Sequence, residues 1–302
     1  MDKKLSYNIR EYADYFECSF SKVIDEIMPK GPEKRVVEAM KYSVLNGGKR
    51  LRPFLVMTTS LLFGVEKEKS IRTAVALEML HSYSLIHDDL PAMDNDDLRR
   101  GKPTCHKAFD EATAILAGDG LLTHVFEVLS DERTHENANI RCELIKYISS
   151  AAGAKDGMIA GQMLDLYAEN LSKDKHDNKL VENIEMMKTG RLLRYACEAG
   201  AILGEASKDK RDALVEYSRK IGMAFQIADD ILDVEGDQKL VGKTLRKDDD
   251  QGKITFVSLY GIGKAKEMSQ KLIDEAIDII SVFGEKADIL KSLARYIITR
   301  SH

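Results

Sequence analysis

Proline is confined to the first 103 residues of this chain of 302 residues, and the remainder contains none. Because proline removes a backbone donor and clashes with the preceding helical turn, a long segment without it favours long helices. Alternating β-branched segments joined by Asn-Gly or Asp-Gly turns, which would predict hairpins, are essentially missing. The sequence therefore predicts an all-α fold, a helical bundle rather than a sheet.

Apolar residues recur at helical spacing along most of the chain. Val36, Met40 and Val44 form one such series, and Ala74, Leu77, Leu80 and Leu85 form another. Further helices are predicted over residues 109–130, 139–170, 179–204, 209–235, 255–260, 263–282 and 286–299, with loops at 131–139 and 171–179. No Gly/Ser linker or fixed repeat divides the chain, so a single domain over residues 1–302 is predicted.

Two aspartate clusters, residues 88–94 and 229–233, lie where predicted helices end. Pro91 is expected to end the first helix, and Gly236 the second. The carboxyl end of a helix carries partial negative charge and repels each carboxylate by roughly 0.3–1 kcal/mol. Clusters in these positions are favourable when a strongly cationic group lies between them, and a hard divalent metal ion is the obvious candidate.

The spacing within each cluster indicates how the carboxylates could converge. Asp229 and Asp233 are i, i+4 on one helical face, which Gln226 shares one turn earlier. Asp88 and Asp94 would be misaligned on a continuous helix, but the proline between them lets Asp94 fold back toward the same ion. Magnesium fits, because it takes one or two carboxylates and completes its shell with water and substrate phosphate.

The carboxylates have two other interpretations. An EF-hand that begins at Asp94 fails, because Arg99 occupies the position that requires glycine. Solvated helix ends remain the plain alternative, and one cluster alone would justify no more than that. Two clusters that each end an apolar helix and face basic groups make the plain alternative weaker.

Basic residues gather before one predicted helix and after the first aspartate cluster. Lys49, Arg50 and Arg52 lie at the positive amino end of an apolar helix, an unfavourable place for cations unless an anion binds there. Arg99 and Arg100 follow the first cluster closely. A solvated basic loop or a surface ion-pair network is the alternative, but carboxylates mixed with arginines suit a site for metal and diphosphate together.

Composition narrows the class of protein. A formal net charge of −5 and a pI near 5.9 argue against a nucleic-acid-binding protein. The four cysteines show neither zinc spacing nor a pairing pattern, which favours a reduced cytoplasmic environment. The amino end lacks an apolar signal region, and no long uninterrupted apolar run predicts a transmembrane segment.

Four segments match a known family in order and spacing: residues 47–53, 87–106, 188–190 and 225–233. Over about residues 20–302 the chain resembles the bacterial trans-isoprenyl diphosphate synthases of the farnesyl/geranylgeranyl group. The resemblance implies an all-α bundle around a deep central cavity, usually a homodimer. It implies Mg²⁺-dependent head-to-tail condensation of isopentenyl diphosphate with dimethylallyl or geranyl diphosphate.

The resemblance also implies roles for individual residues. Three Mg²⁺ ions, which Mn²⁺ can replace, would be held by Asp88, Asp94, Asp229 and Asp233, with Asp248 acting through water. The allylic diphosphate would contact Arg99, Lys188, Thr189, Gln226, Lys243 and Lys253. Isopentenyl diphosphate would be bound by Lys49, Arg52, His81 and Arg100. The residues implied in catalysis itself are Asp88, Asp94, Lys188, Asp229 and Arg99.

Tyr83 is the candidate for setting product length. It precedes Asp88 by five residues, about 7.5 Å along a helix, so its ring could form the floor of a cavity below the aspartates. Ser84 beside it is small. The resemblance implies that this tyrosine, with the two-residue expansion between Asp89 and Asp94, goes with farnesyl diphosphate, and geranylgeranyl or geranyl diphosphate is the alternative. A buried tyrosine without a role in length is also open.

Several residues have structural alternatives to these roles. His81 could be a hydrogen-bonded core histidine, and residues 188–190 could be a tolerated helix interruption instead of a kink that opens toward a ligand. Gly157 and Gly161, with Gln162 and Asp165, are assigned to helix packing by default.

Three other functions fit the sequence less well. A noncatalytic subunit of a heteromeric synthase is disfavoured, because all the aspartates are present. A terpene cyclase is disfavoured by residues 47–53, and a metal-storing bundle leaves Lys49, Arg52 and Arg100 unexplained.

Overall fold

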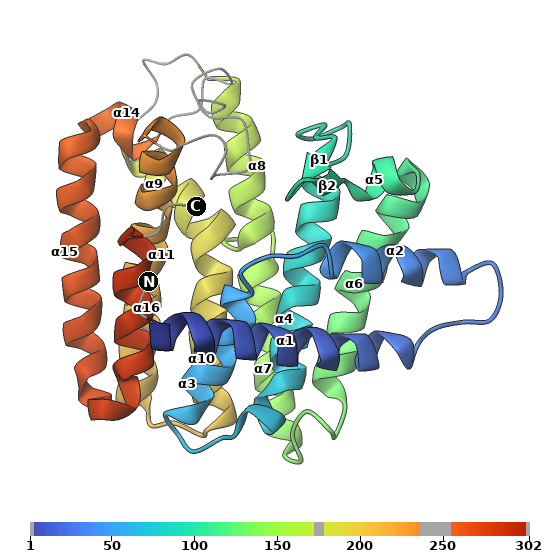
Figure 1. The fold of residues 1–302 in the computed structure, drawn as a ribbon, viewed down its shortest axis with the longest axis horizontal. Coiled ribbons are helices and arrows are strands. Elements are labelled where there is room, and N and C mark those ends of the chain that lie inside the picture. Colours follow the sequence, from blue (N-terminus) through green and yellow to red (C-terminus); the bar gives the residue numbers. More distant parts are fainter. Residues whose placement is uncertain (1–2, 172–177, 236–254, 300–302) are drawn as a thin grey trace.

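The fold is a bundle of helices, and the prediction of an all-α protein is confirmed (Figure 1). The computed structural model describes residues 3–171, 178–235 and 255–299. Its helices are α1 (Lys3–Asp25), α2 (Lys34–Val44), α3 (Leu51–Leu61), α4 (Lys67–Asp88), α5 (Cys105–Ala108), α6 (Glu111–Ser130), α7 (Ala138–Ala152), α8 (Met158–Glu169), α9 (Asn178–Glu185), the π-helix η2 (Met186–Gly190), α10 (Arg191–Leu203), α11 (Lys208–Glu235), α14 (Phe256–Tyr260), α15 (Ile262–Ile280), the 3₁₀-helix η3 (Ser281–Ala287) and α16 (Asp288–Thr299).

Most predicted helices are confirmed within a few residues, and the structure differs from the prediction at two places. The helix predicted over residues 139–170 is wrong, because α7 and α8 are separate helices. A Cβ atom on Gly157 would lie 2.5 Å from the backbone nitrogen of Gly153, so the chain makes a turn there that is too tight for most side chains. The two-residue strands β1 (Leu98–Arg99) and β2 (Lys102–Pro103) form a short antiparallel hairpin that the sequence did not predict.

Most buried apolar side chains from α1 to α16 belong to one contiguous cluster, and a smaller second cluster consists of Val181, Ile227, Phe256 and Ala265. α4 is buried on nearly every side, and α3 and α10 pack against each other beside it. Gly200 on α10 permits this approach, because a Cβ atom there would lie 2.1 Å from the hydroxyl oxygen of Thr59 on α3. The upright helices are crossed by α1 and α2 in Figure 1. The contiguous cluster supports a single domain over residues 1–302, which we keep as a proposal.

One helix among the described residues, α6, is long and apolar enough to cross a membrane by length and composition, with a mean hydropathy of 1.3. Half of that segment is buried in the protein, and α6 packs against α4, α2 and α7. The core helix of a globular protein has the same properties, so the prediction of a chain without a transmembrane segment stays a prediction.

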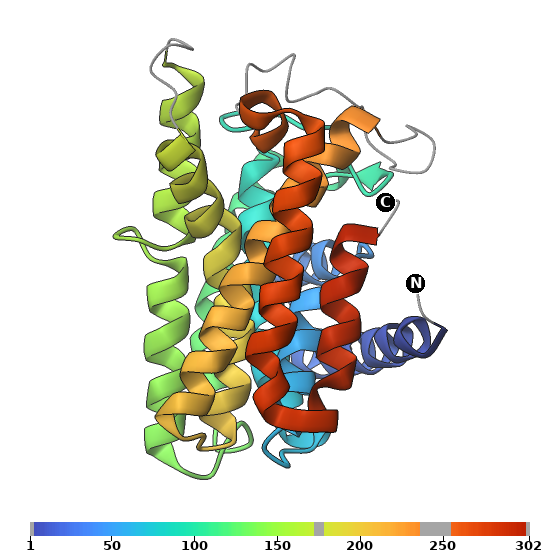
Figure 2. The ribbon, with the colours of Figure 1, turned by 90° about the vertical axis from the view of Figure 1, so that its left-hand side faces the viewer.

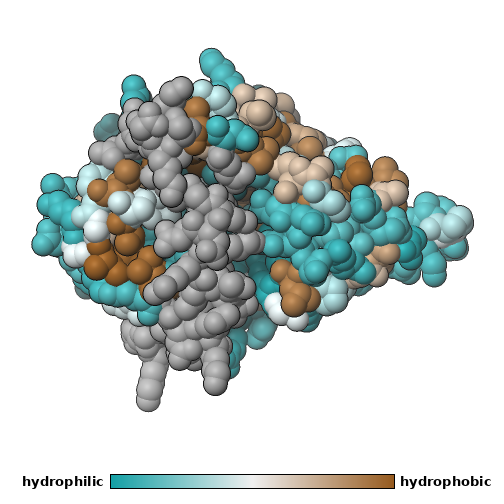
Figure 3. All heavy atoms as spheres, turned by 90° about the horizontal axis from the view of Figure 1, so that it is seen from above, coloured by the Kyte–Doolittle hydropathy of each residue, from teal (hydrophilic) through white to brown (hydrophobic). Residues whose placement is uncertain are grey.

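The carboxyl ends of α4 and α11, which carry the two aspartate clusters, lie toward the same end of the bundle (Figures 1 and 2). The described part of that end is largely hydrophilic on the side of the β1–β2 hairpin (Figure 3). The fold thus brings two acidic segments, far apart in sequence, to one end of the molecule.

Candidate active site

The first aspartate cluster forms a turn that returns to the end of its helix. α4 ends at Asp88, and the backbone nitrogen of Asp94 donates to the carbonyl oxygen of Asp88 at 2.9 Å. Met93 donates similarly to Leu90 at 2.9 Å. The prediction that Asp94 folds back after Pro91 is therefore confirmed for the backbone.

Asp88 is a half-buried carboxyl, and the positive charge around it does not offset the effect of burial on its pKa. Burial raises its pKa from 3.8 to about 6, Lys188 opposes this rise, and Asp94 adds to it. A carboxylate in such a place is stabilised by a further cation. Among the described residues, no three His, Cys, Asp or Glu side chains are placed to hold an ion by themselves. A metal ion at Asp88 and Asp94 would thus need ligands from water or substrate, as magnesium prefers.

Asp89, the second residue of the cluster, has different surroundings from Asp88 and a different partner. It is buried and accepts from Arg99 through both carboxylate oxygens, with the shortest contact from Nη2 at 2.6 Å. Tyr42 of α2 donates to the carbonyl oxygen of Pro103 at 2.7 Å and so fixes the β1–β2 hairpin that carries Arg99. The side chain of Arg99 is therefore held in place by a buried fork of hydrogen bonds.

Lys188 lies in the π-helix η2, which accounts for the interrupted helical pattern at residues 188–190. Its Nζ contacts Oδ2 of Asp165 on α8 at 2.6 Å. A Cβ atom on Gly161 would lie 2.4 Å from the backbone nitrogen of Lys188, so α8 packs directly against η2. The packing role of Gly161 is confirmed, whereas Asp165 is a partner of Lys188 that its spacing alone did not reveal. π-helices of one turn often occur at functional sites.

The second cluster lies near Lys188. Burial raises the pKa of Glu185 well above its usual value, and Asp230 and Asp165 raise it further, while Lys188 lowers it. Glu185 therefore lies within electrostatic reach of both Lys188 and the second cluster. Gln226, Asp229 and Asp233 all lie on the last turns of α11. Asp230 has a separate task, because its Oδ2 accepts from the backbone nitrogen of Phe256 at 2.7 Å.

A basic cavity of about 620 Å³ contains all four residues expected to bind isopentenyl diphosphate, namely Lys49, Arg52, His81 and Arg100. Nη1 of Arg52 lies 3.2 Å from Nε2 of His81. Burial, and then the charge of Arg52, lower the pKa of His81 well below 6.5, so the imidazole is neutral at pH 7. A neutral histidine beside the guanidinium groups of Arg52 and Arg100 leaves the cavity able to accept an anion.

The backbone before α3 brings Arg100 into this cavity. Gly47 and Gly48 have φ values of +83° and +126°, which few other residues adopt. Arg100 donates to the carbonyl oxygen of Gly47. A Cβ atom on Gly48 would lie 2.6 Å from Nη1 of Arg100, so the guanidinium packs where only glycine leaves room.

Arg50 corrects one expectation from the sequence, that three cations of residues 47–53 face an anion. Its side chain is buried and contacts Glu78 at 3.1 Å and Glu17 at 2.9 Å. It also donates to the carbonyl oxygen of Val44 at 2.6 Å and lies over the ring of Phe16. The side chain of Arg50 is thus part of the protein interior. Lys49 and Arg52, its neighbours in the sequence, are the residues that could contact an anion.

A second cavity of about 440 Å³ adjoins the first, since Arg52, His81 and Thr189 line both. It is lined by residues of α4 and η2, Tyr83, Ser84, Asp88 and Lys188, and by apolar residues of α8, Met158, Ile159, Met163 and Leu166. The ring of Tyr83 packs edge-on against His87, with centroids 5.6 Å apart. A cavity with carboxylate and ammonium groups at one part and apolar walls elsewhere suits a hydrocarbon chain that ends in diphosphate.

Some predicted site residues cannot be placed. Lys243, Lys253 and Asp248, like Gly236, lie outside the described residues.

Comparisons with known proteins agree with this geometry. The family model described as polyprenyl synthetase matches residues 33–296. Several relatives 43–46% identical are farnesyl diphosphate synthases; that of Escherichia coli K12 is 46% identical over 272 residues, covering 88% of this chain and 89% of the relative. Geranylgeranyl pyrophosphate synthase 4 of Arabidopsis thaliana is 37% identical, covering 100% of this chain and 80% of the relative.

A solved structure supports the same assignment. The crystal structure of an FPP/GFPP synthase from Zymomonas mobilis superposes with a TM-score of 0.88 at 46% identity, and covers 99% of this chain and 100% of that one. Prenyl synthases of this kind are generally metal-dependent. By its sequence match, its fold and its paired cavities, the chain belongs to the polyprenyl synthetase family.

Proposed function

We propose that this chain is a farnesyl diphosphate synthase, a prenyltransferase that condenses isopentenyl diphosphate with dimethylallyl and then geranyl diphosphate. The observation that carries the proposal is the pair of adjoining cavities, one lined by cations and the other by the carboxylate of Asp88, the ammonium group of Lys188 and apolar side chains. The relatives that are 43–46% identical and named farnesyl diphosphate synthase favour this product over geranylgeranyl diphosphate.

The purified protein with Mg²⁺, isopentenyl diphosphate and either allylic starter is expected to yield mainly the fifteen-carbon diphosphate. Products resolved by chain length in chromatography test this. No condensation with either starter would overturn the proposed function, and a dominant twenty-carbon product would favour the geranylgeranyl alternative.

The residues of the two cavities suggest a division of labour. Lys49, Arg52 and Arg100 would hold isopentenyl diphosphate. Lys188, together with Arg99 from the neighbouring hairpin, would contact the allylic diphosphate and stabilise the negative charge that develops on it. As the allylic C–O bond breaks, its electron pair goes to the diphosphate oxygen. The double bond of isopentenyl diphosphate then forms the new C–C bond, and a proton leaves the adjacent carbon for a diphosphate oxygen.

Metal binding is part of the proposal. Asp88, Asp94, Asp229 and Asp233 are the residues that would hold Mg²⁺ ions, about three per site. Bound there, the ions would neutralise diphosphate charge and so favour loss of the leaving group. The raised pKa of Asp88 supports a cation at this place. We also propose a cytoplasmic homodimer.

Replacing Tyr83 by alanine is expected to lengthen the product by one or more five-carbon units. Tyr83 is 6% exposed and lines the cavity together with Asp88 and Met158, so removal of its ring leaves space for a longer chain. Chromatography of dephosphorylated products measures the change. Tyr83→Phe keeps the ring and is expected to retain the parental product. An unchanged product from Tyr83→Ala would show that the floor of the cavity lies elsewhere.

A further inference from the structure

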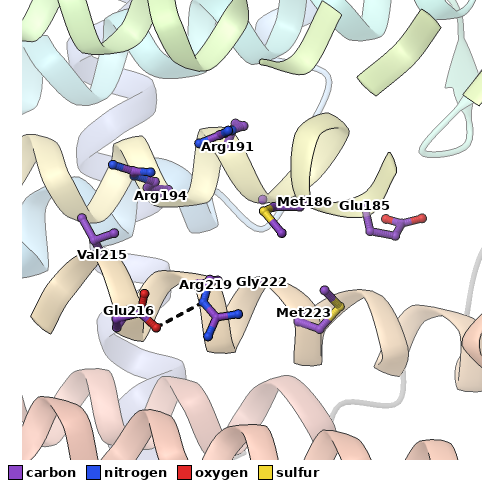
Figure 4. A pocket seen from close by; sticks show the side chains of 10 residues that line it. Glu185, Met186, Arg191, Arg194, Val215, Glu216, Arg219, Gly222 and Met223 are labelled. Atoms are coloured by element: carbon purple, nitrogen blue, oxygen red, sulfur yellow. Dashed lines mark hydrogen bonds and ion pairs between the residues drawn. The ribbon is translucent and has the colours of Figure 1, made fainter. Parts of the chain in front are cut away.

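A third pocket, of about 100 Å³, lies between the π-helix η2 and α11 (Figure 4). It uses Met186 and Gly190 of η2, whereas Lys188 and Thr189 of the same π-helix line the cavities of the candidate active site. We call it the η2–α11 pocket. It has no part in the reaction proposed above.

The walls of the η2–α11 pocket are apolar and adaptable. Met186 comes from one side and Val215 and Met223 from the other (Figure 4). Methionine side chains adjust their shape to different occupants. The two helices are in contact at the base, where a Cβ atom on Gly222 would lie at an ordinary packing distance, 3.7 Å, from Cα of Gly190. The pocket is thus shaped for a small hydrocarbon group.

The rim of the pocket carries arginines from both walls together with the carboxylates of Glu185 and Glu216. Arg194 donates through Nε to Glu198 at 3.3 Å, and Arg219 donates through Nε to Glu216 at 3.1 Å. Within the described part of the chain, the terminal guanidinium nitrogens of Arg194 and Arg219 have no hydrogen-bond partner. A third arginine, Arg191, is held by two hydrogen bonds to Asp156. Donors therefore remain available on both sides of an apolar opening.

We propose that the η2–α11 pocket binds an amphipathic anion, a phosphate monoester with a short aliphatic chain. The chain would fill the space between Met186 and Met223, and the phosphate would accept from the terminal nitrogens of Arg194 and Arg219. Guanidinium groups bind phosphate by paired charge-assisted hydrogen bonds. Neither the phosphate group alone nor the aliphatic chain alone would fill the whole pocket.

A ligand bound in the η2–α11 pocket would affect the active site, because both contact the π-helix η2. α8 supports the other side of η2 at Gly161, where a Cβ atom would lie 2.4 Å from the backbone nitrogen of Lys188. A ligand that moves Met186 therefore displaces the turn that carries Lys188 and raises the KM for the allylic diphosphate. This consequence rests on the proposed function, whereas binding itself does not.

Methyl NMR of protein labelled at methionine tests binding without any assay of activity. Hexyl phosphate is expected to shift the signals of Met186 and Met223, assigned with Met186→Leu and Met223→Leu, in a saturable manner. Inorganic phosphate or hexanol alone is expected to shift them far less. The signals of Met93 and Met163, which line the active-site cavity, report separately on binding there.

The variant Arg194→Met/Arg219→Met is expected to weaken binding of hexyl phosphate at the η2–α11 pocket by about tenfold or more. Arg35→Met removes a similarly exposed arginine that pairs with Asp110 elsewhere, and is expected to bind as the parent does. The absence of saturable shifts at Met186 and Met223 would overturn the proposal. So would unchanged affinity in the double variant, or equal shifts with hexanol alone.

Discussion

Turnover is expected to fall by about two orders of magnitude or more when Asp88 or Asp229 is replaced by alanine, while the fold persists. Each substitution removes a carboxylate proposed to hold metal ions against the allylic diphosphate. Neither side chain supports the core, since Asp88 ends α4 and Asp229 lies on the last turns of α11. Steady-state rates with isopentenyl and geranyl diphosphates, with circular dichroism as a check of folding, measure the effect.

Asp97→Ala is the matched control for this experiment. Asp97 lies in the segment that follows the first cluster, but its carboxylate is exposed and pairs with Lys107 at 2.8 Å. Its replacement is expected to leave turnover near that of the parent. Near-parental turnover in the Asp88 or Asp229 variant would show that the metal assignment is wrong.

The pKa of Asp88 gives this prediction a second readout, the stability of the metal-free protein. Its folded-state pKa of about 6 lies above the ordinary value of 3.8, so the folded state favours the protonated carboxyl. The contribution of this group to stability therefore decreases as pH rises from 3.8 to about 6. Asp88→Asn is expected to be at least as stable as the parent at pH 7 without Mg²⁺, measured by thermal unfolding. A lower melting temperature of Asp88→Asn than of the parent under these conditions would contradict the raised pKa of Asp88.

Replacing Arg50 by methionine is expected to lower the free energy of unfolding by about 3–5 kcal/mol. The substitution leaves the carboxylate of Glu78, which is 3% exposed, without its guanidinium partner. Breaking a buried ion pair by removing one member costs far more than removing both. Urea unfolding followed by circular dichroism measures the loss.

Two further variants separate charge from packing at Arg50. Arg50→Met/Glu78→Gln removes the stranded charge and is expected to recover much of the lost stability. Arg35→Met breaks an exposed pair with Asp110 and is expected to cost less than about 1 kcal/mol. A single Arg50 variant that unfolds at the parental urea concentration would contradict this account.

Much of the fold and the arrangement of the first cluster could be predicted because they depend on local rules. The absence of proline after Pro103 favours long helices, and α11 matches its predicted range almost residue for residue. Pro91 predicts the turn that returns Asp94 to Asp88, since proline cannot continue the helix. The effects of such local steric rules can be inferred from a single sequence.

The parts that could not be predicted depend on contacts between distant segments. Arg50 looks like Lys49 and Arg52 in sequence, and its contacts with Glu17 and Glu78 on other helices make it a core residue. Asp89 and Asp165 likewise acquire their partners Arg99 and Lys188 through the fold. The break between α7 and α8 was missed because glycine near a helix end also fits a continuous helix. The partners of these side chains depend on tertiary contacts, and the periodicity of apolar residues carries no information about such contacts.

The position of Tyr83 on the same helix as Asp88 has a consequence for how such enzymes diversify. The groups that handle charge lie at the end of α4, while the ring that meets the apolar walls of α8 lies more than one turn away. Under the proposed function, a single substitution at Tyr83, or at Met158 or Met163 in the same cavity, is therefore expected to alter product length without disturbing diphosphate chemistry. Evolution, or a small mutant library, can explore new products here while retaining a working catalyst.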